Sequence, residues 1–184
     1  MLDEQGLGDY IDSRFTRNLF RLETLDLYNV NSERDEYRRY VAGETKPNYE
    51  HKKVWMEQIR GEVAHGAHTY RVHVVRSPLS DYLRFECEWG YVYNARAGER
   101  IRILDLAERP RPADLVDEDF WLIDEREVLR MHYDAEGRYV GAEVAPGEML
   151  PRYLAAKDAA WSGAVDFADY WKAHQGYWRD PSVV

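Results

Sequence analysis

The sequence predicts an α+β (mixed α/β) fold, in which a central mixed sheet of about five to six strands has flanking helices and a long C-terminal helix. Three observations predict it. Short runs of β-branched and apolar residues alternate with segments of helical periodicity. Residues 120–123 form a continuous apolar run, which is typical of a central strand covered on both faces. Apolar residues also recur at helical spacing from residue 148 to about residue 174, with a break or kink near Gly163.

The first third of the chain is expected to hold three helices and one short strand. Leu7, Ile11 and Phe15 recur at every fourth position, which predicts an amphipathic helix. Alternation of apolar and polar residues then predicts a strand. Two further helices end at glycines, and the second of these is expected to bury Val54 and Trp55. The elements expected are a helix over 1–20, a strand over 21–28 and helices over about 31–43 and 49–65.

The middle of the chain holds the most regular pattern. The apolar Tyr70, Val72 and Val74 alternate with basic residues, which predicts a strand with an inward apolar face and an outward basic face. Ser77 and Pro78 suit the N-cap and the first position of a helix that runs to about residue 94. The other elements expected are strands over 69–76, 100–104 and 119–123 and a hairpin of 127–133 with 138–144.

Composition and charge bound the class of protein. The 184 residues are 45% hydrophobic and carry 25 basic against 34 acidic side chains, so the formal net charge is −9. This charge disfavours binding to a phosphate backbone, and no run approaches the roughly 20 apolar residues of a membrane span. We therefore expect a cytoplasmic protein that binds neither nucleic acid nor a membrane. One globular domain is expected over residues 1–178, with a loose tail over 179–184.

Motifs for familiar cofactors, nucleophiles and metals are missing from the sequence. It contains neither of the standard glycine-rich phosphate loops and no Gly-x-Ser-x-Gly turn, so no cofactor is expected. Cys87 lies between two glutamates that would raise the pKa of its thiol, and it is expected in the core. His65 and His68 have the spacing of metal ligands, but Gly66 separates them, so a polar helix end is favoured over a metal site.

Polar side chains are concentrated where the basic strand meets the helix that follows it. Arg71 and Arg76 belong to the strand, and Tyr82, Arg84 and Glu86 belong to the helix. Side chains three or four positions apart share one face of a helix, so these groups can line a polar cleft. A salt-bridged outer face is the equal alternative, and such a face stabilises a fold only weakly.

Two residues of the apolar strand complete the candidate set. Trp121 lies within this strand, and Asp124 follows its end. Ligand sites gather at strand ends, yet Asp124 and Glu125 also suit a tight turn, which we favour. The candidate ligand-binding residues are Arg71, Arg76, Tyr82, Arg84, Glu86, Trp121 and Asp124.

Three motifs in residues 77–86 (SPLSDYLRFE), 97–102 (AGERIR) and 119–124 (DFWLID) carry a resemblance. In this order they resemble an actinobacterial family of domains of unknown function, over nearly the whole chain. Members tend to be encoded beside helix-turn-helix regulators, so the resemblance implies such a regulator as a partner but implies no activity. The order of elements is also similar to one half of a phospholipase-D-like domain. The apolar strand lacks the His-x-Lys of that fold, which implies a catalytically inactive copy.

Three functions are consistent with these features. The favoured one is a non-catalytic regulatory module that binds a small polar or anionic molecule, or a partner protein, at the candidate residues. The first alternative is an unrecognised hydrolase or transferase that uses Glu86, Asp124 or His73 as general base. The second is a homo-oligomer, such as a homodimer, because the C-terminal aromatics between Trp161 and Trp178 exceed what one helix stripe can bury.

Overall fold

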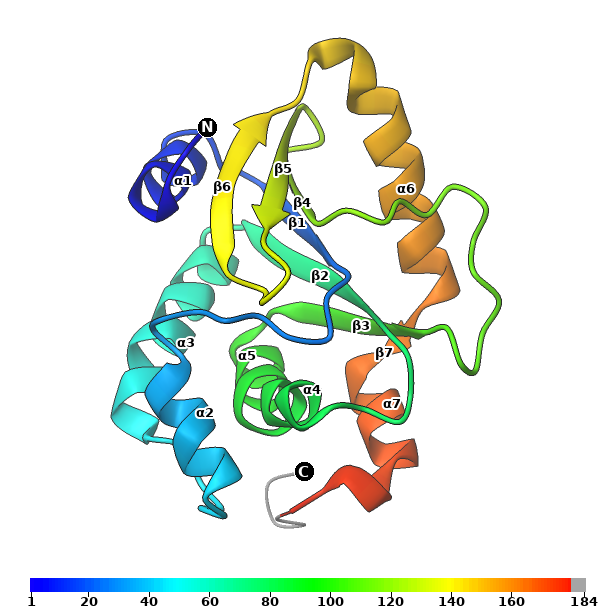
Figure 1. Ribbon diagram of the computed structural model, residues 1–184. Helices are drawn as coiled ribbons and strands as arrows, with labels where there is room; N and C mark the ends of the chain where they lie inside the picture. Colours follow the sequence, from blue (N-terminus) through cyan, green and yellow to red (C-terminus); the bar gives the residue numbers. More distant parts are fainter. Residues whose placement is uncertain (180–184) are drawn as a thin grey trace.

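The computed structural model describes residues 1–179 and contains a seven-stranded sheet in the order β6-β5-β4-β1-β2-β3-β7 (Figure 1). β1, β2 and β3 are mutually parallel, and the other neighbours pair antiparallel. The count exceeds the predicted five to six because a two-residue strand lies just after Gly163. The strands are β1 (Asn18–Glu23), β2 (His68–Val75), β3 (Arg100–Asp105), β4 (Phe120–Ile123), β5 (Glu127–Tyr133), β6 (Tyr139–Val144) and β7 (Val165–Asp166).

Helices lie on both sides of this sheet, which confirms the predicted fold class. The long helix α6 packs on one face, and the remaining helices lie on the other side (Figure 1). No helix in residues 1–179 has the length and hydropathy needed to cross a membrane. The helices are α1 (Glu4–Asp12), α2 (Arg34–Val41), α3 (Tyr49–Ala64), α4 (Asp81–Phe85), a π-helix (Glu86–Tyr91), α5 (Val92–Ala97), α6 (Leu150–Gly163) and α7 (Phe167–Ala173), with 3-10 turns at Gly147–Met149 and Gln175–Tyr177.

The apolar core is concentrated under α6. Phe20 and Leu22 of β1 and Phe120 of β4 are fully buried there, beside Tyr153 and Ala156 of α6. The rings of Phe120 and Tyr153 meet edge-on, with centroids 4.9 Å apart. Because side chains alternate along a strand, the residues between these apolar positions point to the opposite face of the sheet.

That opposite face carries buried charge, which corrects the predicted outward basic face of β2. Arg71 is only 7% exposed and His73 only 1%. The alternation predicted one solvated face, but α4, α5 and α7 cover this side of the sheet as well. Charged groups buried in this way need partners, and the site described below consists largely of such partners.

The N-terminal segment differs from the predicted single helix over 1–20. α1 ends at Asp12, and Asn18–Glu23 is a strand. The carboxylate of Asp124 accepts hydrogen bonds from the backbone N–H groups of Thr16, Arg17 and Asn18. These amides bond to a side chain instead of to a preceding helical turn, so the chain enters the sheet earlier than its periodicity indicates, and the strand predicted over 21–28 starts earlier and ends at Glu23.

Two predicted helices have different details in the structure. α3 has nearly the predicted bounds, but Val54 and Trp55 are 71% and 43% exposed, and Met56 and Ile59 are buried in their place. The helix predicted from Pro78 begins at Asp81, because the hydroxyl of Ser80 accepts a hydrogen bond from the N–H of Leu83 and caps it.

The C-terminal aromatics pack within their own chain. Tyr170 and Trp171 of α7 are buried. The ring of Trp161 meets that of Tyr70 edge-on. The homodimer inferred from them stays a prediction. Arg179, expected in the loose tail, donates to the carbonyl of Tyr40 and lies over its ring; the other tail residues, 180–184, lie outside the described part of the chain.

Candidate functional site

A hollow of about 550 Å³ lies between the sheet and the helices on its charged side. Its floor is formed by Arg21 and Glu23 of β1, Arg71 of β2 and Trp121 of β4. Its walls come from the loop after β1, from α2 and α3, and from the continuous helix of α4, the π-helix and α5. Pockets for small molecules have volumes of roughly 300–1,000 Å³, so this hollow has the size of a ligand site.

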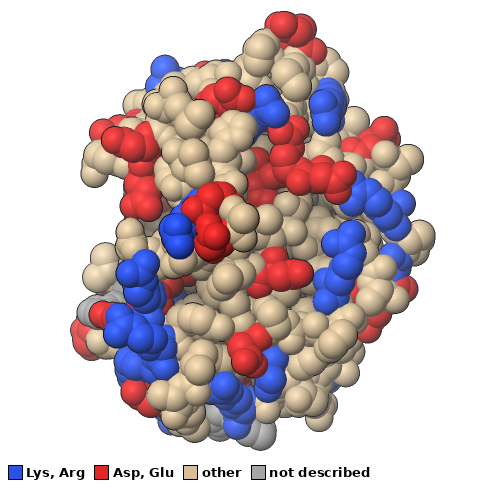
Figure 2. Space-filling model, in the orientation of Figure 1, with Lys and Arg blue, Asp and Glu red and all other residues tan. Residues whose placement is uncertain are grey.

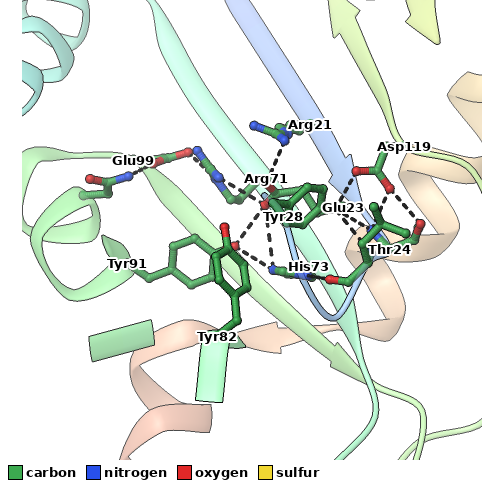
Figure 3. Close-up of polar contacts among 12 residues, drawn as sticks. Arg21, Glu23, Thr24, Tyr28, Arg71, His73, Tyr82, Tyr91, Glu99 and Asp119 are labelled. Carbon is green, nitrogen blue, oxygen red and sulfur yellow. Dashed lines mark hydrogen bonds and ion pairs between the residues drawn. The ribbon is translucent and has the colours of Figure 1, made fainter. Parts of the chain in front are cut away.

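Glu23 is the centre of the polar network on the floor (Figure 3). Its carboxylate oxygens lie 3.1 Å from Arg21 Nη2 and 3.1 Å from Arg71 Nη1. The hydroxyl of Tyr91 donates to the same carboxylate at 2.9 Å. Burial alone raises the pKa of Glu23, but the two guanidinium groups outweigh it and lower this pKa to about 2. Glu23 is therefore ionised at neutral pH.

Arg71 is held by a second buried carboxylate. Its Nε lies 2.6 Å from Oε1 of Glu99, and the amide of Asn94 donates to the other oxygen of Glu99 at 2.9 Å. Arg21 lies over the ring of Trp121, with 5.0 Å from its guanidinium carbon to the ring centroid. The two guanidinium groups are thus committed to carboxylates and aromatic rings within the protein.

His73 is placed beside this network but not as a free base. Its Nε2 is 3.0 Å from the carbonyl oxygen of Leu25, and its Nδ1 is 2.7 Å from the hydroxyl of Tyr91. A carbonyl oxygen can only accept, so Nε2 carries a proton, and Nδ1 is occupied by Tyr91. The buried ring therefore positions the loop after β1 and has no free nitrogen for a substrate.

Tyr28 belongs to this loop and forms part of the wall of the hollow. Its hydroxyl donates to Asp119 at 2.5 Å, and Asp119 also accepts from the N–H and hydroxyl of Thr24 at 2.8 and 2.7 Å. The tip of the β5–β6 hairpin supports the same loop, because the carbonyl of Gly137 accepts from the N–H of Asn29 at 2.9 Å. Gly137 has a φ of 73°, and a side chain there would overlap the carbonyl oxygen of Leu27.

The π-helix brings Glu86 and Gly90 to the hollow. Both residues line it, and a β-carbon built on Gly90 would lie 3.6 Å from Oε2 of Glu86. A π-helix has a wider turn than an α-helix and is frequent at functional sites. Burial, followed by the charges of Glu33 and Glu23, raises the pKa of Glu86 to about 8, although Lys52 and Arg71 act in the opposite direction.

The outer part of the hollow is acidic and aromatic. Glu33, just before α2, accepts a hydrogen bond from the hydroxyl of Tyr82 at 3.1 Å. Glu36 also lines the hollow but is paired with Arg39 at 2.8 Å. Lys52 and Trp55 of α3 close this end, and the partial exposure of Trp55 places it at the rim.

Four of the seven residues predicted from the sequence line this hollow, namely Arg71, Tyr82, Glu86 and Trp121. The other three lie elsewhere. Arg76 is exposed just after β2, Arg84 pairs with Asp81 and lies over the ring of Tyr177, and Asp124 binds the backbone before β1. Asp124 and Glu125 have φ of 49° and 57° and form the tight turn between β4 and β5, as predicted.

Several lining residues were not predicted, among them Arg21, Glu23, Tyr28, Glu33 and Lys52. One signal was available: the predicted strand at 21–28 starts with Arg21, and a charged residue on each of two predicted strands can pair across a sheet. Cys87 is buried as predicted, and burial raises the pKa of its thiol. Among the side chains that the structure describes, no three from histidine, cysteine or acidic residues come together as metal ligands.

Charge is mixed on the face of the molecule that is seen in Figure 2. Figure 2 shows basic and acidic side chains interspersed on the face that it presents. The hollow is therefore distinguished by its enclosed charges and aromatic rings, and not by a broad field of one sign.

Comparison with models of protein families assigns this domain to a family. The model of a domain of unknown function (DUF6879) matches residues 6–172. The chain belongs to this family. The match includes all seven strands and every residue that lines the hollow, so the hollow lies entirely within the DUF6879 domain. A search of curated proteins finds no match to the chain.

Proposed function

We propose that this DUF6879 domain is a non-catalytic, cytoplasmic regulatory module that binds a small polar molecule in the hollow over β1 and β2. The observation that carries this proposal is the hollow itself. It has a ligand-sized volume of about 550 Å³, aromatic walls and a floor of ion pairs held rigidly by buried partners. Such a combination of apolar surface with a few fixed polar groups is typical of small-molecule sites.

The placement of the candidate bases supports a binding function. His73 and Asp124 are saturated by hydrogen bonds within the protein, so of the three bases considered only Glu86 lines the hollow. A helix-turn-helix regulator is the partner implied by the resemblance described above, and ligand binding in the hollow would then alter that association.

Ligand screening by NMR tests this proposal. We expect polar fragments to shift the indole N–H signals of Trp55 and Trp121 and the amide signal of Gly90. Gly90→Leu, which fills the hollow next to Glu86, should abolish these shifts. Gly61→Leu is the matched control, because a β-carbon on this glycine of α3 meets no atom within 4 Å.

Shifts confined to other surfaces, or unaffected by Gly90→Leu in a folded protein, would show that the hollow is not the site. If Gly90→Leu does not fold, the positions of the shifted signals in the unmodified protein decide the question on their own.

A second candidate function is acid–base catalysis by Glu86 in a hydrolase or transferase. The specific observation is a carboxyl group in the hollow whose pKa is raised to about 8, near the value that suits a general acid or base at neutral pH. Turnover of a bound fragment that is lost in Glu86→Gln, with binding retained, would favour catalysis over the binding module.

A further inference from the structure

We infer that the hollow takes a small organic ammonium ion, which is held between Glu86 and Glu33. This inference rests on the proposed binding function and names the chemical class of its ligand. It follows from the balance of charge in the hollow, from the groups left without an ionic partner and from the aromatic walls.

Among the carboxyl groups that line the hollow, Glu33 and Glu86 share a single nearby cation, Lys52. Arg21 and Arg71 are neutralised by Glu23 and Glu99 through contacts of 2.6 to 3.1 Å. Glu36 is paired with Arg39, so Lys52 is the lining cation that remains for Glu33 and Glu86, and a cationic ligand would supply the second counter-ion.

Glu33 and Glu86 are the carboxyl groups that a ligand can reach. Both line the hollow, and neither forms an ion pair within 4 Å among the described side chains. Glu23, in contrast, already accepts from three side chains. A cation placed between Glu33 and Glu86 would contact two carboxyl groups that lack an ion pair within 4 Å and share Lys52 as their nearby cation.

The aromatic side chains around these two glutamates also favour a cation. The rings of Tyr28 and Tyr82 lie 6.2 Å apart between centroids, and both line the hollow together with Trp55. The faces of such rings attract organic cations, with a stabilisation of roughly 0.5–2 kcal/mol per contact. Their apolar surface suits the hydrocarbon part of an organic ammonium ion.

An anionic ligand fits this arrangement less well. Arg21 and Arg71 would have to leave buried carboxylates, which is costly because each carboxylate would then remain buried without its partner. Lys52 is the remaining cation of the hollow, and an anion beside it would also lie near Glu33 and Glu86.

Ligand binding should be coupled to the proton on Glu86. The groups that face Glu86 are Glu33 before α2, Glu23 and Arg71 on the sheet, Lys52 on α3, and Tyr82, Cys87 and Tyr91 on its own continuous helix. Burial and the two glutamates raise the pKa of Glu86 to about 8, so at pH 7 about nine-tenths of it is protonated. The ionised form binds the ammonium ion, so affinity should rise about 50-fold between pH 6 and pH 8 and fall again at higher pH, where the ammonium ion loses its own proton.

Isothermal titration calorimetry with three probes of similar shape tests the inference. Benzylammonium chloride, benzyl alcohol and sodium benzoate differ mainly in charge. We expect benzylammonium to bind best, to release close to one proton at pH 7 in buffers of different ionisation enthalpy, and to show the predicted dependence on pH. Glu86→Gln should remove both the proton release and the pH dependence.

Asp81→Asn is the matched control for Glu86→Gln. It removes one negative charge from α4, but Asp81 is exposed and does not line the hollow. This variant should keep the pH dependence. If Glu86→Gln fails to fold, the carboxyl carbon of Glu86, followed by NMR in the unmodified protein, should lose its titration near pH 8 when benzylammonium is bound.

Tighter binding of benzoate or benzyl alcohol, or benzylammonium affinity that does not change between pH 6 and pH 8, would overturn the inference. If none of the three probes binds while the fragment screen finds another ligand in the hollow, the ammonium inference fails and the binding function stands. If the screen finds no ligand in the hollow, the binding function itself fails.

Discussion

Replacing Glu23 with glutamine should destabilise the fold by about 3 kcal/mol at pH 7. The substitution keeps the shape of the side chain but removes the charge that Arg21 and Arg71 share at 3.1 Å each. The pKa of Glu23 falls from 4.5 to about 2 in the folded protein, a difference of about 2.5 units at 1.36 kcal/mol each. Loss of one partner from a buried ion pair costs about 3–5 kcal/mol. This general value agrees with the free energy obtained from the pKa difference of Glu23.

The same shift predicts how this stabilisation depends on pH. The pKa of Glu23 is lower in the folded than in the unfolded chain, so its contribution is fully present above pH 4.5 and is lost as the pH falls towards 2. Urea denaturation of the unmodified protein and Glu23→Gln at pH 7 and pH 3 measures this directly. The difference in unfolding free energy should shrink by about half at pH 3.

Asp35→Asn is the control for this experiment. Asp35 pairs with Arg38 at 2.7 Å, but both side chains are largely exposed, so its removal should leave the urea midpoint unchanged. An unfolding free energy of Glu23→Gln within 1 kcal/mol of the unmodified protein at pH 7 would show that the buried network does not stabilise the fold as argued.

Three further variants separate structural side chains from those of the hollow. Asp124→Ala removes the acceptor for three backbone N–H groups and should lower the unfolding free energy by about 2 kcal/mol in urea, with fragment binding unchanged. Tyr28→Phe leaves the buried Asp119 without its shortest hydrogen bond and should cost about 1–3 kcal/mol in the same assay. Arg84→Ala should leave fragment binding unchanged by NMR, because Arg84 contacts Asp81 and Tyr177 outside the hollow. Loss of binding in this variant would show that Arg84 belongs to the ligand site.

The sequence predicts the strands of this fold well because their signals are local. The continuous apolar run at β4 and the hairpin of β5 and β6 lie where the pattern places them. Alternation along β2 is also real, yet it does not show whether the basic face meets water or a second layer of helices. Arg71 and His73 are buried because helices distant in sequence cover that face.

The candidate site is only partly predictable for the same reason. The contact between Glu23 and Arg71 depends on the pairing of two parallel strands, which sets Arg21 beside Arg71. Sequence periodicity does not report that register. The widened turn that directs Glu86 into the hollow is likewise invisible in the pattern, because an ordinary helix over the same residues has the same apolar spacing.

The contact at Gly137 connects the hollow with a distant part of the chain. This glycine is more than 100 residues after Leu27, yet its backbone contacts the loop that carries Tyr28 and fixes the position of this loop. Gly137 is buried against this loop, so a methyl group there would displace the loop. Ligand affinity should therefore respond to a change at the tip of the β5–β6 hairpin, where Ala135 and Glu136 are exposed next to the buried Gly137.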